Sequence, residues 1–356
     1  MSSPTATAKG YGISNTSNYT DFSVQEFKLK TPHADDVTLD IEVCGVCGSD
    51  VHTLTGGWGD LSAPWVVAGH EIVGKVTHVG DNVKEFKVGQ RVGVGAQVLS
   101  CLKCDRCNGD NEQYCPEQVD TYNAKFPDGV ESQGGYSTAI RTHQRFVFAI
   151  PDAIKSEDAA PMLCAGLTVF SPLVRNGAGP GKTVGIVGIG GLGVNFAIQF
   201  AHHLGAKVIV FSHSPNKKDD ALSLGADEFV STSEDGFADK YFDKIDYILS
   251  AADANSIPLG DLLSTLKVDG KLTSVGLPDE AWEGLKPQMM ASNAACVGCS
   301  HVGSKKEANQ MLKLAAEKGI KPIIDEVLPM SQAAKAIESV KNNTVRYRYV
   351  LKQDLA

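Results

Sequence analysis

The sequence predicts an α/β protein of two parts, a β-rich part up to about residue 160 and a doubly wound parallel sheet after it. The first part contains short β-branched runs separated by glycine turns, as in residues 71–95. From about Asp158 onward, apolar strands alternate with segments of helical periodicity, which is typical of a parallel sheet covered by helices. The length of 356 residues also exceeds what one ordinary hydrophobic core holds.

The β-rich part is predicted to be a compact antiparallel barrel. Residues 37–43 alternate apolar and polar side chains, as a half-buried strand does. Within 71–95, the turns Gly-Asp, Val-Gly and Gly-Gln separate runs that are too short for helices. The tail has an amphipathic helix at 305–318 and a Tyr/Val-rich segment at 346–351, and we expect it to return to this part. The predicted domains are residues 1–160 with 303–356, and residues 161–302.

The second part shows the repeating pattern of strand and helix. Gly205 and Gly225 follow two helical segments, at the place where a helix C-cap belongs. The expected strands are 183–187, 208–211, 245–250 and 271–275, and the expected helices are 193–204 and 218–224.

Composition narrows the class of protein. Hydrophobic residues make up 42% and charged residues 21% of the chain, as in soluble globular proteins. The net charge of −9 argues against nucleic acid or an anionic membrane as a partner, because both require a basic face. No apolar run approaches the roughly 18 residues of a membrane span, and residues 1–10 lack the apolar centre of a signal peptide. The expected location is therefore the cytoplasm.

Four of the nine cysteines lie in one short segment, C-L-K-C-D-R-C-N-G-D-N-E-Q-Y-C, with two, two and seven residues between successive sulfurs. Such a cluster can enclose a tetrahedral Zn²⁺, which needs no other ligand in a structural site. Disulfides are poor candidates in a chain without a secretory signal. The spacing also differs from ferredoxin patterns of iron–sulfur ligands. We therefore predict a structural zinc on Cys101, Cys104, Cys107 and Cys115.

A glycine-rich loop follows the strand at 183–187 and opens a helix. In this context the pattern G-x-G-x-x-G predicts a dinucleotide site, because the glycines allow a tight turn and the close approach of a diphosphate to the helix N-terminus. The alternative is a packed glycine turn without a ligand. The predicted cofactor-binding residues of the loop are Gly188, Ile189, Gly190, Gly191, Leu192 and Gly193.

The end of the second strand of this sheet indicates which dinucleotide binds. An NAD site has an acidic residue there to hold the ribose 2′-hydroxyl, whereas this chain continues F-S-H-S-P-N-K-K. Hydroxyl and lysine side chains can bind the extra phosphate of NADPH, which a carboxylate would repel. We predict NADPH, with Ser212, His213, Ser214 and Lys217 in the cofactor site. The alternative is a solvated polar loop.

Three further residues, Cys47, His70 and Cys164, are far apart in the sequence. Two thiolates, one imidazole and one exchangeable position make a catalytic zinc site. Taken singly, a buried cysteine or histidine more often has a packing role.

These residues lie in a series of motifs that follow one another along the chain: GVCGSDVH, GHEIVG, the four-cysteine lobe, LCAGLTV, GIGGLG, FSHSPNKK and VRYRYV. The motifs and their order are those of one enzyme family. The chain resembles the zinc-dependent medium-chain alcohol dehydrogenases. Within them it is most similar to the cinnamyl alcohol dehydrogenase branch, which includes NADPH-dependent aldehyde reductases of fungi. The resemblance implies a GroES-like catalytic domain, a Rossmann cofactor domain and a homodimer formed by sheet extension between cofactor domains.

The resemblance also implies residue roles. Cys47, His70 and Cys164 resemble the catalytic zinc ligands, and Glu71 resembles a carboxylate that can take the fourth position. Asp50 resembles the group that steadies the ligand histidine, and Ser49 and His52 resemble a proton relay. The residues that resemble the nicotinamide side of the cofactor site are Thr168, Val275, Gly276, Leu277, Ser300, His301 and Val302, and Arg348 is added to the cofactor contacts.

Two other motifs receive simpler interpretations. Trp58 lies in a glycine-rich loop, and we expect it either to line the substrate pocket or to act as an apolar lid residue. The C-x-x-C pair Cys296 and Cys299 lies in a strand-like run, and we expect it to pack in the core, with a redox pair or a metal clip as the alternative.

The expected function is the zinc- and NADPH-dependent interconversion of aldehydes and primary alcohols, with cinnamaldehyde-like, aromatic or medium-chain aliphatic substrates. Zinc would act as a Lewis acid, with two ions per chain. A polyol dehydrogenase of the same superfamily is the second hypothesis, and a non-catalytic scaffold that binds zinc or cofactor is the third.

Overall fold

The computed structural model describes residues 6–188 and 194–355. Its contacts divide the chain into two compact units, Met1–Leu167 with Gly303–Ala356, and Thr168–Val302. The first boundary lies later than residue 160. The reason is that α3 (Ser156–Pro161) packs on strands β3 and β4, and the π-helix Met162–Gly166 packs on β4. Residues 161–167 therefore belong with the β-rich unit.

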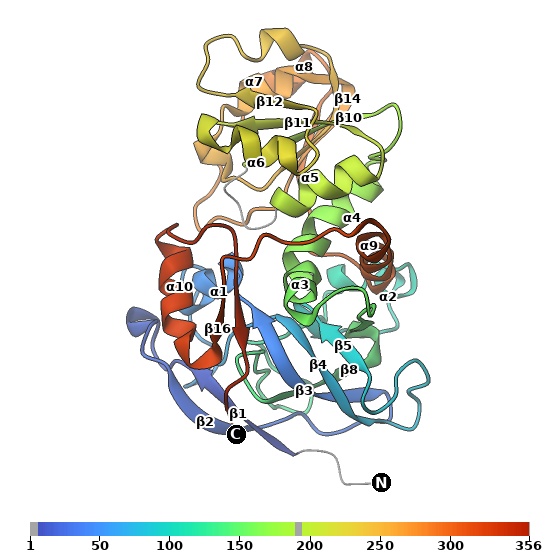
Figure 1. The fold of residues 1–356 in the computed structure, drawn as a ribbon, viewed down its shortest axis with the longest axis vertical. Coiled ribbons are helices and arrows are strands. Elements are labelled where there is room, and N and C mark those ends of the chain that lie inside the picture. The colour runs from blue at the N-terminus through green and yellow to red at the C-terminus, as the bar shows by residue number, and fades with distance from the viewer. Residues whose placement is uncertain (1–5, 189–193, 356) are drawn as a thin grey trace. The chain divides into compact units, whose positions relative to one another are not determined.

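The first unit is built on a seven-stranded sheet (Figure 1). The hydrogen-bonded order is β16-β17-β3-β4-β5-β9, with β8 also paired to β3. All of these pairs are antiparallel except β16 with β17, so the described strands form one mixed, open path. The strand bounds are β3 Asp36–Gly45, β4 Glu71–Val79, β5 Arg91–Val94, β8 Ala139–His143, β9 Val147–Ala149, β16 Glu326–Pro329 and β17 Tyr349–Lys352.

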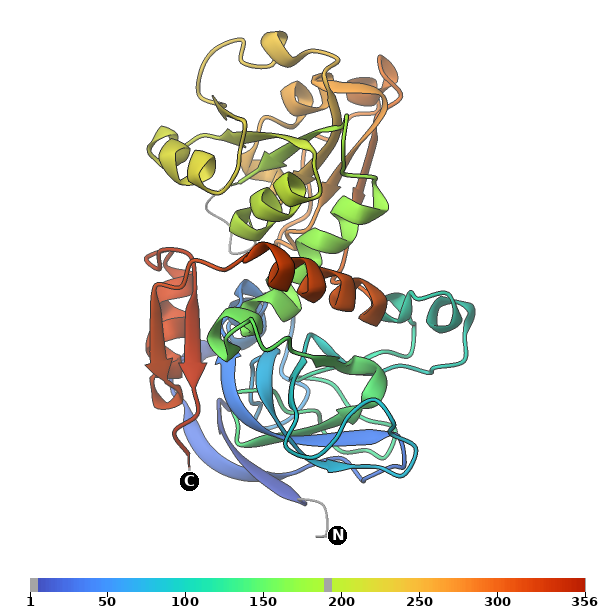
Figure 2. The same ribbon diagram turned by 45° about the vertical axis from the view of Figure 1, so that its right-hand side comes forward.

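The C-terminal tail returns to this sheet, as predicted. Figure 2 shows β16 and β17 side by side at its edge, and Leu351 of β17 pairs with Cys44 of β3. Helix α9 covers Lys305–Lys318, the predicted range. Ser304 and Glu307 form a capping box at its start, and Gly319 closes its end with a φ of 67°, a left-handed conformation that glycine adopts without strain. Helix α10 covers Ala333–Lys341.

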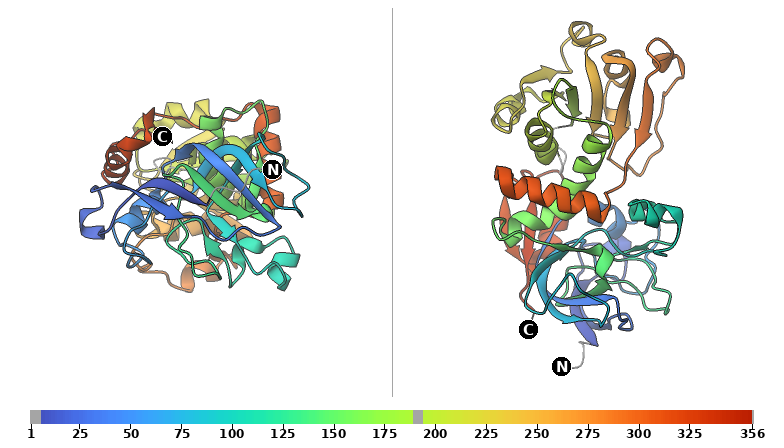
Figure 3. Two further views of the ribbon diagram at one scale, coloured as in Figure 1. Left: turned by 90° about the horizontal axis from the view of Figure 1, so that it is seen from below. Right: turned by 90° about the vertical axis from the view of Figure 1, so that its right-hand side faces the viewer.

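Strands β3 and β4 of the main sheet, blue to cyan, run together in the view from below in Figure 3. Two smaller sheets complete the first unit. A second sheet joins β1 (Thr7–Gly12) to β2 (Ser23–Lys28), and a third joins β6 (Gln97–Leu99) to β7 (Val119–Asp120). The four-cysteine lobe lies between β6 and β7 and contains the short helix α2 (Asp105–Asn108). Fully buried side chains such as Leu39, Ile72 and Tyr136 form the core under the main sheet.

The second unit is a parallel six-stranded sheet in the order β12-β11-β10-β13-β14-β15. The order reverses after β12, so right-handed crossovers put the helices before and after this point on opposite faces. The strands are β10 Thr183–Val187, β11 Lys207–Ser212, β12 Glu228–Ser231, β13 Ile245–Ser250, β14 Leu266–Ser274 and β15 Cys296–Cys299. The helices are α4 Leu167–Arg175, α5 Val194–His203, α6 Lys218–Ser223, α7 Leu259–Ser264 and α8 Gln288–Ala291.

The expected burial of the C-x-x-C pair was wrong. Cys296 and Cys299 are both exposed, because β15 is the edge strand of the sheet and pairs with β14 on one side only among the described strands. The run has the composition of a strand, but its place in the sheet depends on the topology of the whole unit. None of the helices in the described ranges combines the length and apolar character that crossing a membrane requires.

Candidate active site

Four predicted ligands meet in the first unit. One ligand atom from each of Cys47, His70, Glu71 and Cys164 lies within 4.8 Å of the others. Cys47 stands two residues after β3 and caps the start of α1 (Gly48–Leu54), while Glu71 is the first residue of β4 and His70 precedes it. Because Gly45 and Glu71 are paired across the two strands, residues 47 and 70 come side by side. Cys164 lies within a π-helix, a feature that is frequent at functional sites.

The distances suit a tetrahedral ion. The Sγ atoms of Cys47 and Cys164 are 3.9 Å apart, and a zinc ion with Zn–S bonds of about 2.3 Å separates two sulfurs by about 3.8 Å. Nε2 of His70 lies 3.1 Å from the Cys164 sulfur. The four side chains are buried, with Glu71 wholly inaccessible. The donor set therefore fits zinc, which prefers sulfur and imidazole ligands.

The two sulfurs differ in acidity. Contact with the Cys164 sulfur, and then with His70, holds the pKa of the Cys47 thiol well below its usual value against the effect of burial. Contact with Cys47 and burial raise the pKa of Cys164 well above its usual value. The contact between the two sulfurs therefore favours the thiolate form of Cys47. A bound cation would favour the thiolate form of both residues, since thiolates and not thiols are metal ligands.

Asp50 orients the ligand histidine His70. Its carboxylate is fully buried and accepts a hydrogen bond of 3.0 Å from His70 Nδ1. Burial is the largest single influence and lowers the pKa of His70, but the charge and hydrogen bond of Asp50, together with Cys47, outweigh it and raise the pKa well above its usual value. With Nδ1 occupied, Nε2 is the nitrogen that faces the sulfurs, as metal sites generally require. The carboxylate also accepts hydrogen bonds from Cys47 N, Gly69 N, Tyr122 OH and Tyr136 OH.

Glu71 lies against Arg348. Arg348 Nη2 is 2.5 Å from Glu71 Oε1, and neither side chain is accessible. Burial raises the pKa of Glu71 to about 8, although Arg348 opposes the rise. The second oxygen, Oε2, is buried without a hydrogen-bond partner among the described residues, so it remains available to a cation. Arg348, predicted to contact the cofactor, is fully buried in the first unit, with Glu71 and the Val46 carbonyl as its neighbours.

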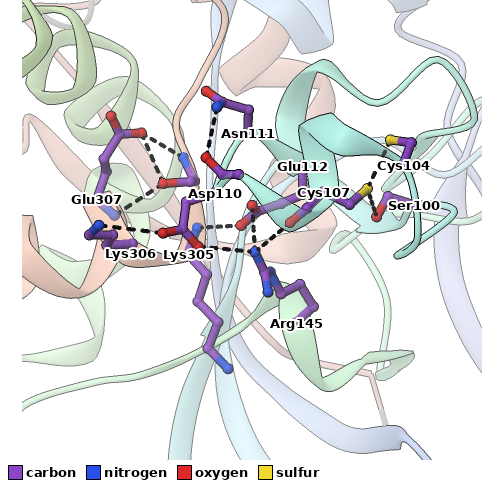
Figure 4. A network of polar contacts seen from close by, with 12 residues as sticks. Ser100, Cys104, Cys107, Asp110, Asn111, Glu112, Arg145, Lys305, Lys306 and Glu307 are labelled. Atoms are coloured by element: carbon purple, nitrogen blue, oxygen red, sulfur yellow. Dashed lines mark hydrogen bonds and ion pairs between the residues drawn. The ribbon is translucent and has the colours of Figure 1, made fainter.

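The four-cysteine lobe forms a second cluster. Three sulfur–sulfur distances are 3.6 Å for Cys104–Cys107 and 3.9 Å for Cys101–Cys107 and Cys104–Cys115, again close to the edges of a zinc–sulfur tetrahedron. Backbone N–H groups of Lys103 and Cys104 lower the pKa of Cys101 to about 6, while burial raises the pKa of Cys107 to about 12. Figure 4 shows Ser100 beside Cys107, with an Oγ–Sγ distance of 3.3 Å.

The proposed relay residues lie on α1. Ser49 Oγ is 3.7 Å from the Cys47 sulfur. The ring of His52 stacks on Trp58 with centroids 4.8 Å apart and an interplanar angle of 7°. Trp58 itself is 44% exposed. The structure therefore places the expected pocket residue directly against the expected proton carrier, a pairing that the sequence analysis did not predict.

Several of the predicted cofactor residues that the structure describes lie at the carboxyl ends of the strands of the second unit. Gly188 follows β10 with a φ of 95°, and a β-carbon there would lie 2.8 Å from the side chain of Ala252, so only glycine fits. Ile189, Gly190, Gly191, Leu192 and Gly193 lie outside the described residues. Ser212 ends the neighbouring strand β11, and its Oγ accepts a hydrogen bond from Ser214 N at 3.1 Å. His213 is exposed and Lys217 is half-buried.

The other cofactor candidates lie at the same ends of the parallel strands. Residues 275–277 follow β14 and residues 300–302 follow β15, and Ser300 N donates to Ser274 O at 3.0 Å. Carboxyl ends of parallel strands are where ligands of such sheets bind. Thr168 lies on α4 and is half-buried.

Comparison with known proteins identifies the class. Residues 33–152 match the family model of the alcohol dehydrogenase GroES-like domain, and residues 191–317 match that of zinc-binding dehydrogenases. The chain is 44% identical over 348 residues to "NADP-dependent alcohol dehydrogenase 6" of Saccharomyces cerevisiae, with 96% of each chain covered. It is 42% identical over 348 residues to "Probable mannitol dehydrogenase 1" of Stylosanthes humilis, with 97% of each covered. A solved cinnamyl alcohol dehydrogenase from Sorghum bicolor superposes with a TM-score of 0.90 at 36% identity, over 97% of each chain.

The chain therefore belongs to the zinc-binding, medium-chain alcohol dehydrogenases. Within that family it is a member of the cinnamyl alcohol dehydrogenase branch. The predicted GroES-like and Rossmann domains and the predicted use of zinc are confirmed.

Proposed function

We propose that the protein reduces aldehydes to primary alcohols with NADPH, and catalyses the reverse reaction, at the site formed by Cys47, His70 and Cys164. The observation that carries the proposal is the convergence of two sulfurs and an imidazole on one point, beside a buried carboxylate oxygen of Glu71 that has no hydrogen-bond partner among the described residues. Three firm ligands and one exchangeable position are the mark of a catalytic zinc site, whereas a structural site is closed by four ligands.

The residues of the chain have distinct roles in this proposal. When bound, zinc polarises the carbonyl oxygen as a Lewis acid and NADPH supplies the hydride. Asp50 keeps the His70 ring turned toward the sulfurs. Ser49 is close enough to the Cys47 sulfur to stand beside a substrate oxygen, and we assign it delivery of the proton to the product oxygen in reduction. His52, four residues along from the start of α1, replaces that proton on Ser49 and receives it in the reverse reaction, because its imidazole is suited to proton transfer near neutral pH.

Selectivity for NADPH rests on the end of β11. Ser212, Ser214 and Lys217 supply hydroxyl, amide and ammonium groups, and no carboxylate stands in residues 211–218. A charge-assisted hydrogen bond contributes about 1.5–3 kcal/mol. We therefore expect a preference for NADPH over NADH of at least about tenfold, the factor that corresponds to 1.4 kcal/mol. The name of the yeast relative includes the same cofactor.

The substrate class is tested with a panel. Cinnamaldehyde, benzaldehyde, hexanal and the polyol mannitol are assayed with both cofactors, and zinc is counted per chain. We expect the highest kcat/KM for the aldehydes with NADPH, and two zinc ions. Oxidation of mannitol with greater efficiency than any aldehyde reaction would favour the polyol dehydrogenase hypothesis; the name of the Stylosanthes relative makes mannitol the polyol to test. Absence of turnover with one zinc per chain would favour the scaffold.

The ligand assignment has its own test. Cys47→Ala should remove turnover and lower the zinc count from two to one, because the ion loses one of its two thiolate ligands. The matched variant Cys44→Ala changes a buried cysteine of the neighbouring strand outside the cluster, and it should retain both ions. Full activity of the Cys47 variant would overturn the assignment.

We also propose a homodimer in which two copies pair through β15. This strand is the edge of its sheet and bears exposed Cys296 and Cys299. Its sequence, C-V-G-C, has none of the charged residues or prolines that usually protect an exposed sheet edge.

A further inference from the structure

The carboxylate of Asp50 accepts four hydrogen bonds in addition to the one from His70. Oδ1 accepts hydrogen bonds from His70 Nδ1 at 3.0 Å, Gly69 N at 3.2 Å and Tyr122 OH at 2.8 Å. Oδ2 accepts from Cys47 N at 2.9 Å and Tyr136 OH at 3.0 Å. Each carboxylate oxygen is therefore fixed by one tyrosine hydroxyl.

The two tyrosines come from separate loops. Tyr122 follows β7 and Tyr136 precedes β8, and both are buried, at 8% and 0% exposure. Their rings also touch the site: the Tyr122 ring lies 5.7 Å from that of His70, and the Tyr136 ring lies against the backbone of Gly69. Phenylalanine would preserve these ring contacts and remove only the hydroxyl. The hydrogen bonds can therefore be tested separately from packing.

A buried carboxylate without full hydrogen bonding is costly. A backbone N–H already donates to each oxygen of Asp50. The tyrosine hydroxyls therefore complete the hydrogen bonding of the carboxylate and also fix its orientation. Tyr122 and His70 share Oδ1, and Tyr136 holds the opposite oxygen. With both hydroxyls in place, rotation of the carboxylate about its terminal torsion breaks two tyrosine hydrogen bonds in addition to the two backbone ones. The orientation of the His70 ring then follows from that of Asp50.

We propose that Tyr122 and Tyr136 are positioning residues for the catalytic metal, which act through Asp50 to keep Nε2 of His70 directed at the two sulfurs. The inference rests on the proposed ligand set of Cys47, His70 and Cys164. The roles of the tyrosines go beyond the pairing of Asp50 with the ligand histidine. Loss of either hydroxyl loosens the imidazole, so that the metal leaves faster.

The experiment measures release of zinc from the full-length, zinc-loaded protein to a chromogenic chelator. The structural zinc of the four-cysteine lobe is an internal reference in the same chain. Groups that orient a metal ligand typically alter metal affinity by about 10- to 100-fold when removed. We expect Tyr122→Phe and Tyr136→Phe each to accelerate release of the catalytic ion by about tenfold, with the release of the structural ion unchanged. The value of kcat should fall more than KM rises.

Tyr241→Phe is the matched control. Tyr241 is also buried, and its hydroxyl donates to the carboxylate of Glu228 at 2.8 Å, in the second unit. It should lose stability comparably while keeping wild-type zinc release. A second control combines each phenylalanine variant with Asp50→Asn, which removes the charged acceptor. If the tyrosines act through Asp50, their effect on release shrinks in this background, because coupled residues are not additive.

The outcomes separate the two levels of the proposal. Two zinc ions in the wild type, together with unchanged release in both phenylalanine variants, would overturn the positioning role and leave the proposed function intact. The same holds if the effect of either tyrosine is undiminished in the Asp50→Asn background. A wild type that holds zinc only in the four-cysteine lobe would overturn the ligand assignment itself.

Discussion

The stack of His52 on Trp58 joins two residues whose roles were predicted separately. A ring pair of this kind contributes about 0.5–1.5 kcal/mol beyond area burial, enough to favour one orientation of the imidazole. Trp58 is 44% exposed, so it presents one face to His52 and has further surface that a substrate can contact. Its effect on turnover can therefore come through the proton carrier, through the substrate, or through both.

Trp58→Ala distinguishes these effects at the residue scale. If the indole mainly orients His52, kcat should fall about two- to tenfold for both cinnamaldehyde and the small substrate propanal, the range that corresponds to the strength of the stack. If the indole mainly binds substrate, only the aromatic aldehyde should lose kcat/KM. Trp58→Phe keeps an aromatic face and should recover most of the loss in the first case. Equal kinetics of Trp58→Ala and wild type on both substrates would exclude either role.

Sequence reasoning at this scale was strongest where chemistry is local. The spacing of the four cysteines indicated their joint role, because residues so close in sequence are close in any fold. Cys47, His70 and Cys164 required a family resemblance, since no local pattern connects them. Tyr122 and Tyr136 were missed, because they meet Asp50 across 72 and 86 residues of chain. Arg348 was assigned to the cofactor, and its burial against Glu71 depends on strand β17, whose pairing places it there.

At the scale of elements, the four-cysteine lobe is tied to the start of α9. Arg145 Nη2 donates to the Cys107 carbonyl at 3.1 Å and to Glu112 Oε2 at 2.9 Å, while Glu112 Oε1 accepts from Lys305 N at 2.7 Å (Figure 4). Glu112 is 2% exposed and so forms a buried bridge between lobe and helix. Helix α9 in turn places Met311 beside Gly166, two residues from Cys164.

Removing this bridge should loosen the lobe. Glu112→Gln leaves Arg145 with only the more exposed Asp110 as an anionic partner and removes a buried charge-assisted hydrogen bond, which costs about 1–3 kcal/mol of folding stability. The expected result is a lower urea midpoint and faster loss of the structural zinc. Glu85→Gln is the control, because Glu85 pairs with Lys305 of the same helix but is 61% exposed, and exposed pairs contribute at most about 1 kcal/mol. Equal urea midpoints for the two variants would show that Glu112 does not stabilise the contact between the lobe and helix α9.

Elements themselves were predicted where their own residues determine them. Helix α9 carries its capping box and its terminal glycine within the helix and its flanks, and its bounds were correct. The strands at 183–187 and 245–250 were also predicted at their observed bounds. The exposure of Cys296 and Cys299 was not predictable in this way. Burial of a strand depends on whether another strand pairs beside it, which is a property of sheet order.

At the scale of the whole molecule, the two edges of the parallel sheet differ. The outer strand β12 includes Glu228, which pairs with Lys207 and Lys240, so this edge has the charged side chains that discourage pairing. The opposite edge, β15, consists of C-V-G-C. An uncharged edge is a template for another strand. A second copy of the chain can satisfy the outward N–H and C=O groups of β15 by extending the sheet.

Gly298→Lys tests this arrangement. A β-carbon at Gly298 meets no atom within 4 Å, so the isolated chain should accept the substitution without loss of its own core packing. At a symmetric β15–β15 junction, however, the variant introduces two like charges close together, and like charges opposite each other destabilise a strand pair. We expect sedimentation velocity to find wild type and Gly298→Ala as dimers and Gly298→Lys as monomers, with unchanged far-UV circular dichroism. A Gly298→Lys protein that remains dimeric at micromolar concentration would place the contact between copies elsewhere, because two lysines at a β15–β15 junction would repel each other.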